Sequence, residues 1–378
     1  MAKPAESVPP GARSALDLPP EKAMLELVQL VQKIDRGAKR LARLSEDELA
    51  IATAPKEEIL ARDMVRLYRY TPVVDKPLRT PVLIIYALVG RYQMIDLEAH
   101  RSFVRRLLAE GLDVYMIDWG LPKRVHRFAT IDDYVNDYLD DCIETICARH
   151  QVEKINLIGI CQGGVFATCY AALHPDRVRN LVLAVTPLDF HGDAGELESG
   201  SGYVNLWARA MEGADVDLLI DTLGTIPGPV VGFSFLMMSP VSNVTKYTTE
   251  LVNILDDDAK LLNFLHMERW IADRPDHPGE IGRQWLKDLY QGNKLVKGEL
   301  MLGARRVDLG AITMPVLNVY ANGDVIVPTA CSRGFAGRFG TDDYSELEVP
   351  GGHIGTFVGG KAQKVLAPGI VKWLKERM

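Results

Sequence analysis

A cysteine lies at the centre of a short turn flanked by glycines. Residues 154–164 read KINLIGICQGG, an apolar run followed by G-x-C-x-G, and the helix-forming stretch 165–173 comes next. In this strand–turn–helix, the nucleophile elbow, the backbone strains the central residue so that its side chain points out of the sheet. Gly159 and Gly163 suit the turn because a side chain at either position would collide with the neighbouring strand and helix. The pattern predicts that Cys161 presents a nucleophilic thiol.

Two downstream residues have the chemistry to activate that thiol. Asp324 follows the apolar run 314–321, and His353 follows the turn after the run 346–349. A histidine can take the thiol proton while a carboxylate fixes its tautomer and stabilises the imidazolium. The order nucleophile, acid, histidine is that of the α/β-hydrolase fold rather than of chymotrypsin or subtilisin. We therefore predict a Cys161–His353–Asp324 catalytic triad.

Two other aspartates are weaker candidates for the acid. Asp118 ends an apolar run, but it precedes the nucleophile along the chain. Asp189 follows the run after the elbow, where some hydrolases place their acid, and it stays a minor alternative. The sequence contains no G-x-S-x-G, which disfavours a serine nucleophile.

Backbone N–H groups are expected to stabilise the oxyanion of an acyl-transfer intermediate. The helix that begins at Gln162 points its N-terminus at the thiol, which favours the thiolate. We expect the backbone N–H of Gln162 to form half of the oxyanion hole. The other half is expected from the loop after the apolar run 82–87, at Leu88 and Val89.

The chain from about residue 80 alternates apolar runs with helical patterns. Continuous apolar runs separated by helices predict a parallel sheet covered on both faces. The predicted class is therefore α/β, an α/β-hydrolase fold with a mostly parallel central sheet. Between about residues 188 and 308 the alternation stops. This insertion opens with the glycine-rich stretch 192–202 and continues with helical segments around 206–223 and 257–290.

The insertion is interpreted as a largely helical cap over the active site, since it lies above the carboxyl ends of the strands. Its apolar run 230–238 is far too short to cross a membrane. We interpret this run as cap core. A dimer, polymer or lipid contact is the alternative.

The N-terminal region has a helical pattern. Apolar residues recur at three- and four-residue intervals over residues 21–44, which predicts an amphipathic helix whose stripe packs on the main domain, with partner binding as the alternative. Ser45 with Glu48 resembles a capping box for a second helix, and Pro55 suits the first turn of a third. The predicted organisation is an N-terminal helical extension, a first half of the core, a cap insertion and a second half of the core: residues 1–78, 79–187, 188–308 and 309–378.

Composition excludes several classes of function. The 378 residues are 47% hydrophobic, which is ample for a core, and the net charge of −7 gives no general reason to expect nucleic-acid binding. No stretch approaches the length of a transmembrane helix, and residues 1–20 lack the apolar region of a signal peptide. Five cysteines with no C-x-x-C pair predict neither a disulfide framework nor a metal site. These features favour the cytoplasm.

A cysteine nucleophile also bears on the class of substrate. Exchange of one thioester for another is close to thermoneutral, so a thiol could accept an acyl group from a thioester carrier and keep it activated. Transfer to an alcohol would then be downhill. Water must be kept from such an intermediate, and a closed apolar cap could exclude it.

In its motifs the chain resembles the polyhydroxyalkanoate synthases, specifically the short two-component type called class III, with class IV as the near alternative. The absence of the long N-terminal domain of the single-component synthases favours the type that works with a second subunit. The resemblance rests on fragments from both core and cap: GICQGG at 159–164, YALV at 86–89, DVYMIDWG at 113–120, KLLNFL at 260–265, NKL at 293–295 and GHIG at 352–355.

The resemblance implies an acyltransferase that polymerises short-chain (R)-3-hydroxyacyl-coenzyme A, such as the 3-hydroxybutyryl thioester, with release of coenzyme A. Cys161 would carry the acyl group, His353 would act as general base, and Asp324 would support it or act on the substrate hydroxyl. The thioester is the substrate, so no separate cofactor is expected. The resemblance also implies a homodimer, a second synthase subunit and a growing polyester granule in the cytoplasm.

Two positions depart from the family. Val325 stands after the acid where members often carry histidine, which leaves His353 as the better base. Gly90 stands where asparagine is expected, in the loop after Val89. Because coenzyme A carries phosphates, basic cap residues are candidates to bind it, with solvated surface charge as the alternative: Arg269, Lys294 and Lys297.

Two other functions stay open at this point. A cysteine-dependent α/β hydrolase, such as a thioesterase or a dienelactone-hydrolase-like enzyme, would use the same triad and release free acid. A catalytically silent, granule-associated scaffold is the weaker alternative, since an intact triad argues against it.

Overall fold

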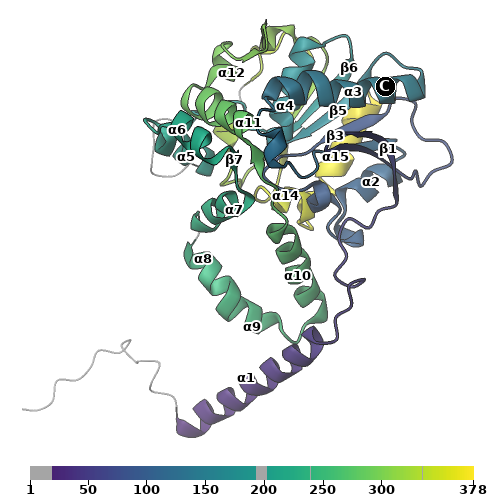
Figure 1. Ribbon diagram of the computed structural model, residues 1–378. Coiled ribbons are helices and arrows are strands. Elements are labelled where there is room, and N and C mark those ends of the chain that lie inside the picture. The colour runs from purple at the N-terminus through teal and green to yellow at the C-terminus, as the bar shows by residue number, and fades with distance from the viewer. Residues whose placement is uncertain (1–18, 193–201, 239, 334) are drawn as a thin grey trace, which may run out of the picture. The chain divides into compact units, whose positions relative to one another are not determined.

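The computed structural model describes residues 19–192, 202–238, 240–333 and 335–378 (Figure 1). The start of the chain and most of the glycine-rich stretch 192–202 therefore lie outside the described residues. The chain divides into two compact units. The larger comprises Ala50–Ser239 and His266–Met378, and the smaller comprises Met1–Leu49 and Pro240–Leu265.

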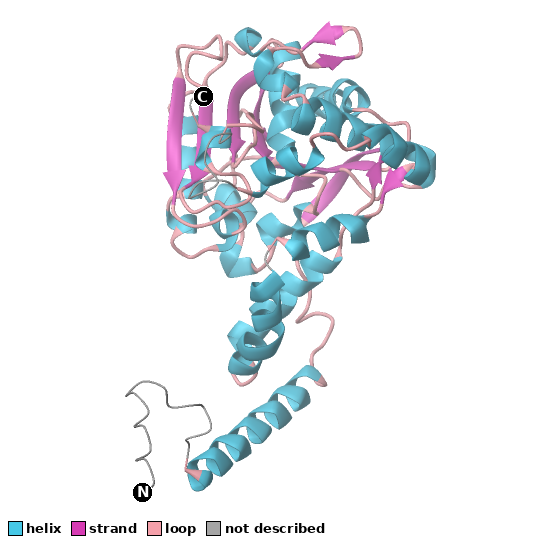
Figure 2. Ribbon diagram, turned by 90° about the vertical axis from the view of Figure 1, so that its left-hand side faces the viewer, coloured by secondary structure: helices cyan, strands magenta, loops and turns pink. Residues whose placement is uncertain are grey.

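An eight-stranded sheet forms the centre of the larger unit (Figure 2). Its strands follow the order β1-β2-β4-β3-β5-β6-β11-β12, and the last six in this order are parallel to one another, whereas β1 and β2 run antiparallel to their neighbours. The predicted α/β-hydrolase sheet is thus confirmed. The strands are β1 (Lys56–Arg62), β2 (Val65–Tyr70), β3 (Val82–Ile85), β4 (Val114–Asp118), β5 (Ile155–Ile160), β6 (Val178–Ala184), β11 (Val316–Ala321) and β12 (Tyr344–Val349).

Side chains of the buried strands divide between two apolar layers, one on each face of the sheet. In β3, Leu83 and Ile85 belong to one layer, and Val82 and Ile84 belong to the other, as the period of two along a strand requires. Helices α3 (Asp140–His150) and α4 (Gln162–Leu173) contribute to the first layer. Helices α2 (Phe103–Ala109) and α15 (Leu366–Lys375) contribute to the second.

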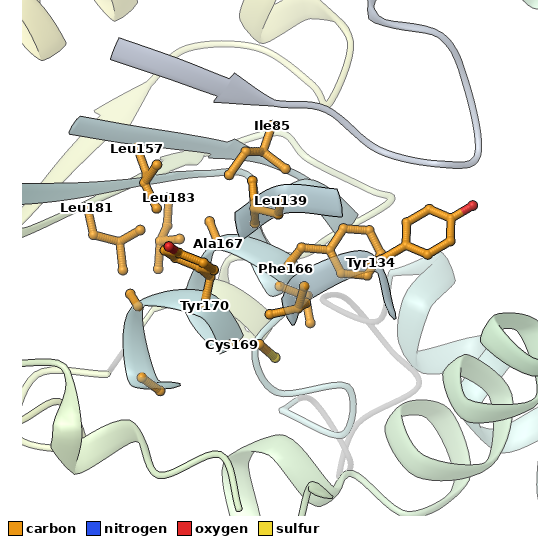
Figure 3. Packing of buried hydrophobic residues seen from close by; sticks show 14 of the residues in the cluster. Ile85, Tyr134, Leu139, Leu157, Phe166, Ala167, Cys169, Tyr170, Leu181 and Leu183 are labelled. Carbon is orange, nitrogen blue, oxygen red and sulfur yellow. The ribbon is translucent and has the colours of Figure 1, made fainter. Parts of the chain in front are cut away.

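The first layer fixes the helix that follows the elbow. Figure 3 shows Tyr170 of α4 beside Leu181 and Leu183 of β6, and Phe166 of α4 beside Tyr134. All five side chains are fully buried. This packing holds the N-terminus of α4 at the carboxyl end of β5, where Cys161 lies.

The N-terminal prediction is wrong between residues 45 and 70. Ser45 and Glu48 make the hydrogen bonds of a capping box, at 3.0 and 3.2 Å, yet residues 46–49 form turns rather than a helix. Pro55 precedes strand β1 instead of starting a third helix. The reason is a hairpin: polar and apolar residues alternate in β2, and Asp63 takes a positive φ of 51° at the turn, a conformation that closes tight hairpins.

The cap insertion leaves the sheet after β6 and returns at β11, its neighbour in the sheet. Its part in the larger unit is mainly helical: α5 (Tyr203–Met211), α6 (Val216–Leu223), α7 (Gly228–Met237), α11 (Gly279–Gln284), a π-helical turn at Trp285–Gln291, and α12 (Lys294–Lys297). The apolar run of α7 was expected in the cap core, but Val230, Phe233 and Met237 are 52%, 63% and 55% exposed. That expectation is wrong for these side chains.

The smaller unit joins the N-terminal helix to the second part of the insertion. It contains α1 (Pro20–Leu41), α8 (Pro240–Thr245), α9 (Leu251–Ile254) and the first half of α10 (Asp258–Ala272). Gly37 packs on Leu255, and Lys33 pairs with Asp256 at 3.1 Å. Within this unit Met24 and Leu27 of α1 are 62% and 53% exposed. In the described part of the chain, no helix combines the length and the apolar character needed to cross a bilayer.

The elbow geometry predicts that an alanine at Gly163 destabilises the fold. A Cβ atom there would collide with the carbonyl oxygens of Ile85 and Tyr86, and overpacking of this kind costs about 1–3 kcal/mol. We expect Gly163→Ala to lower the free energy of unfolding in urea by that amount. Gly360→Ala is the matched control, because nothing lies within 4 Å of its added Cβ. Equal losses in the two variants would contradict the packing described here.

Candidate active site

Cys161 occupies the turn between β5 and α4 in a strained backbone conformation. Its φ is 54° and its ψ is −121°, a region that residues with a side chain rarely adopt. Two hydrogen bonds hold it there: Cys161 N–H donates to the Ala184 carbonyl at 3.0 Å, and Gly164 N–H donates to the Cys161 carbonyl at 2.9 Å. The sulfur is thereby presented at the N-terminus of α4, whose dipole favours a thiolate.

Asp324 lies in the loop after β11 and is fully hydrogen-bonded. Its Oδ1 accepts from the backbone N–H groups of Ile326 and Val327, both at 2.9 Å. Its Oδ2 lies 2.7 Å from His353 Nδ1. The side chain is almost completely buried and is not among the residues that line the cavity at Cys161. Asp324 therefore contacts His353 and is not in contact with the cavity.

His353 lies in the loop after β12, next to the loop that carries the acid. The two loops are tied together because Gly323 N–H donates to the Gly351 carbonyl at 2.9 Å and Asn322 N–H donates to the Val349 carbonyl at 3.1 Å. Gly351 takes a φ of 117°, which suits glycine. The parallel pairing of β11 with β12 thus places the acid and the histidine side by side.

The electrostatics of His353 favour its protonated form. Burial by itself lowers the pKa of the imidazole, but the neighbouring charge of Asp324, the Cys161 sulfur and hydrogen bonds to both hold its pKa well above the ordinary value. The Cys161 sulfur and the His353 ring line the same cavity. An imidazolium in this position stabilises a thiolate, the nucleophilic form of cysteine.

Cys161 and His353 open into a cavity of about 200 Å³. Most of the lining is apolar or aromatic, and it comes from the core loops and the cap: Tyr86, Val89, Ile160, Phe235, Met267, Trp270, Ile271, Ile326, Ile354 and Phe357. Burial, with a smaller contribution from the Cys161 sulfur, raises the pKa of Tyr86. The cavity therefore offers a neutral phenol and an apolar wall beside the reactive pair, which suits an acyl chain.

The N–H groups expected in the oxyanion hole are arranged differently from the prediction. The helix N-terminus does place Gln162 directly after the nucleophile. Leu88 N–H and Val89 N–H, however, both donate at 3.0 Å to the side-chain Oε1 of Gln162. In this structure these two groups fix the loop to the elbow.

The rival acids lie outside the site. Asp118 pairs with Arg91 at 3.1 Å and accepts from Gly120 N–H at 3.0 Å. Asp189 accepts from Asn293 Nδ2 at 2.7 Å and from a backbone N–H at 3.0 Å. His353 has its short carboxylate contact with Asp324 alone among these three aspartates.

The basic residues singled out for coenzyme A do not line the cavity. Lys294 Nζ pairs with Asp288 at 2.6 Å, and Lys297 Nζ donates to the Gly292 carbonyl at 2.7 Å. Arg269 belongs to α10 and is also absent from the lining. A role of these three residues in binding coenzyme A stays a prediction.

Two residues of the cavity were missed from the sequence. Arg274 is the one Lys or Arg among the described residues that line the cavity. Its guanidinium donates to the Val89 carbonyl at 3.0 Å and lies 4.7 Å from the centre of the Phe235 ring. Trp270 packs on Gly90, where a Cβ would lie 2.9 Å from the indole. Gly90 therefore makes room for the indole. No periodic pattern marks either residue, because their partners are nearly two hundred positions away in the chain.

Comparisons with known proteins agree with this geometry. A family profile described as the alpha/beta hydrolase fold matches residues 80–359, and a second, described as the poly-beta-hydroxybutyrate polymerase (PhaC) N-terminus, matches residues 21–107. Among solved structures, a soluble variant of monoglyceride lipase from Saccharomyces cerevisiae superposes with a TM-score of 0.54 at 13% identity, covering 87% of this chain and 96% of that one. That likeness concerns the fold alone.

Sequence relatives are much closer. The poly(3-hydroxyalkanoate) polymerase subunit PhaC of Synechocystis sp. is 47% identical over 358 residues, which cover 94% of this chain and 94% of the relative. The corresponding subunit of Allochromatium vinosum is 43% identical over 364 residues, which cover 96% of this chain and 99% of the relative. On this similarity, with the α/β-hydrolase fold and the arrangement of Cys161, His353 and Asp324, the chain belongs to the poly(3-hydroxyalkanoate) polymerase family.

Proposed function

We propose that this enzyme is an acyltransferase that polymerises (R)-3-hydroxyacyl-coenzyme A into polyester with release of coenzyme A. The observation that carries the proposal is the Cys161–His353–Asp324 arrangement at an apolar cavity, in a chain that is 47% identical to a poly(3-hydroxyalkanoate) polymerase subunit. The thioester is the substrate, and the residues at the site provide the nucleophile and base without a further group.

The first proposed step is acylation of the enzyme. The Cys161 thiolate attacks the thioester carbonyl while His353 holds the thiol proton. The bond from Cys161 sulfur to the acyl carbon forms, and the bond from that carbon to the sulfur of coenzyme A breaks. Coenzyme A leaves as a thiol after taking the proton from His353. Both ends of the exchange are thioesters, so the acyl group stays activated on the enzyme.

Ester formation uses the same histidine in reverse. The 3-hydroxyl of an incoming hydroxyacyl thioester attacks the acyl carbon on Cys161 and gives its proton to His353. The new ester bond forms, the bond to Cys161 sulfur breaks, and the thiolate returns to its pair with the imidazolium. Asp324 has both oxygens engaged, so it supports this base rather than replacing it. The apolar cavity limits competition from water.

The proposal extends to the substrate range and the assembly of the enzyme. We propose, on the family resemblance, that short-chain units such as 3-hydroxybutyryl are accepted. The relatives are named as polymerase subunits, which supports a second synthase subunit. The class III type, with class IV as the near alternative, is proposed on the family resemblance. Homodimerisation and attachment to polyester granules in the cytoplasm are proposed on the family resemblance.

A paired assay tests the proposal against hydrolysis. With (R)-3-hydroxybutyryl-coenzyme A, we expect released thiol to be matched by sedimentable polyester, and both to fall by at least about 10³-fold in Cys161→Ala, because the nucleophile is lost. Cys147→Ala is the matched control, since this free cysteine lies away from the cavity, and it should behave as wild type.

The same assay separates the alternatives. Thiol matched by free 3-hydroxybutyrate would make the protein a thioesterase and would contradict the proposal. Full polymer formation by Cys161→Ala would contradict the proposed nucleophile. A supplied second subunit should be tested in parallel, because an activity that appears only with it supports the two-component class.

The support of His353 by Asp324 predicts the direction of a pKa change. Because the Asp324 carboxylate raises the pKa of His353, Asp324→Asn should lower that pKa toward the ordinary histidine value. The change can be measured by NMR titration of the labelled imidazole, with Cys161→Ala in both proteins so that the thiol does not titrate alongside. In the enzyme with Cys161 intact, Asp324→Asn should also lower kcat by about 10²–10⁴-fold.

Asp189→Asn is the control for this measurement. Asp189 is hydrogen-bonded to Asn293 instead of His353, so its replacement should leave the His353 titration where it is. If the His353 pKa is unchanged in Asp324→Asn, or falls in Asp189→Asn instead, the assignment of Asp324 as the acid is wrong.

A further inference from the structure

The loop between β3 and residue 91 is held by side chains from two directions. On the side of the elbow, the Gln162 carboxamide oxygen accepts both Leu88 N–H and Val89 N–H at 3.0 Å. On the side of the cap, the Val89 carbonyl accepts from Arg274 at 3.0 Å, and the Arg91 carbonyl accepts from the Trp270 indole at 2.8 Å. A loop without regular structure thus has its backbone fixed on both edges.

The Gln162 side chain occupies the inner position of this arrangement. Gln162 is only 6% exposed, and it is absent from the lining of the cavity. Its carboxamide therefore lies behind the loop and not in the space that a substrate would fill. One oxygen thus accepts the N–H groups of the buried Leu88 and the half-buried Val89, and leaving a buried N–H unpaired is costly.

Gln162 also connects the start of α4 to a loop that lines the cavity at Cys161. Its backbone N–H follows Cys161 at the start of α4, the position from which such a group is expected to stabilise the oxyanion of an acyl-transfer intermediate. Its side chain sets the position of the opposite loop. A misplacement of about 1 Å in such a site is enough to lower a rate by about 10²-fold, so this connection has a direct bearing on catalysis.

We propose that Gln162 is a positioning residue for acyl transfer, whose carboxamide braces the loop at Leu88 and Val89 against the nucleophile elbow. The N–H groups of Leu88 and Val89 then serve to place the loop and do not receive the oxyanion. The inference rests on the proposed function only in so far as the reaction passes through an oxyanion at Cys161.

Three properties of the side chain make glutamine suited to this role. It has an acceptor oxygen, it has the length to reach from α4 to the loop, and it is uncharged. Methionine has a similar length but no comparable acceptor, asparagine is one methylene shorter, and glutamate keeps an acceptor oxygen at the same reach. These differences allow the brace to be removed or retained without a large change in volume.

The experiment compares two reactions of the same thiol. Acylation by (R)-3-hydroxybutyryl-coenzyme A, followed as the first release of coenzyme A, passes through an oxyanion. Alkylation of Cys161 by iodoacetamide does not. We expect Gln162→Met to slow acylation by about 10–100-fold with little change in the alkylation rate. Gln162→Glu should recover part of the acylation rate, because its carboxyl oxygen can accept the same two N–H bonds.

Gln284→Met is the matched control. Gln284 also accepts a backbone N–H through its carboxamide, that of Ile131 at 2.7 Å, but it does not line the cavity. Its replacement should leave both reactions at the wild-type rate. A general loss of folding would instead slow acylation and alkylation together.

The outcomes are distinct. Acylation that is unchanged or faster in Gln162→Met, or acylation and alkylation that fall by the same factor, would overturn the proposal. S-phenyl thioacetate serves as a second acyl donor, so that the test of Gln162 does not depend on the proposed substrate. If the hydroxyacyl thioester does not acylate the wild type, the proposed substrate is wrong. The rate at which S-phenyl thioacetate acylates Cys161, compared between wild type and Gln162→Met, still decides the role of Gln162.

Discussion

The strained backbone at Cys161 is the constraint on which the rest of the site depends. A residue with a side chain takes a φ of 54° there only because its surroundings fix it: the end of β5 on one side, the packed helix α4 on the other, and glycines where any side chain would collide. The strain places the sulfur at a helix N-terminus, in the cavity that His353 also lines. Acid, base and cavity are then arranged around that point.

The sequence predicts those parts of the site that depend on local structure and chain order. The five residues of G-x-C-x-G specify a local turn. The acid and the histidine follow β11 and β12, and parallel pairing of these strands is expected where strands alternate with helices. The pair formed by His353 and Asp324 could therefore be predicted. The loop of Leu88 and Val89 lies beside the elbow, as expected from the sequence. The role of its N–H groups, however, depends on the rotamer of Gln162, which no pattern in the sequence specifies.

The errors have a similar physical origin. A third helix was expected from Pro55 because proline suits the first turn of a helix. The residues after it instead form the hairpin of β1 and β2, and β2 pairs with β4 in the sheet. The run in α7 is apolar yet exposed, since hydrophobic composition alone does not say which neighbours an element has. Arg274 and Trp270 act on the loop at residues 89–91 from positions far along the chain, so only the folded structure brings them together.

The central claim is that polyester forms through an acyl group carried by Cys161, and trapping that intermediate tests it most directly. The enzyme would be mixed with (R)-3-hydroxybutyryl-coenzyme A, quenched in acid within one turnover and digested for peptide mass spectrometry. The account predicts one or more hydroxybutyryl units on the peptide that contains Cys161, in amounts that match the coenzyme A released. Release of coenzyme A with the acyl group on another residue, or with no acylated peptide while polymer accumulates, would contradict it.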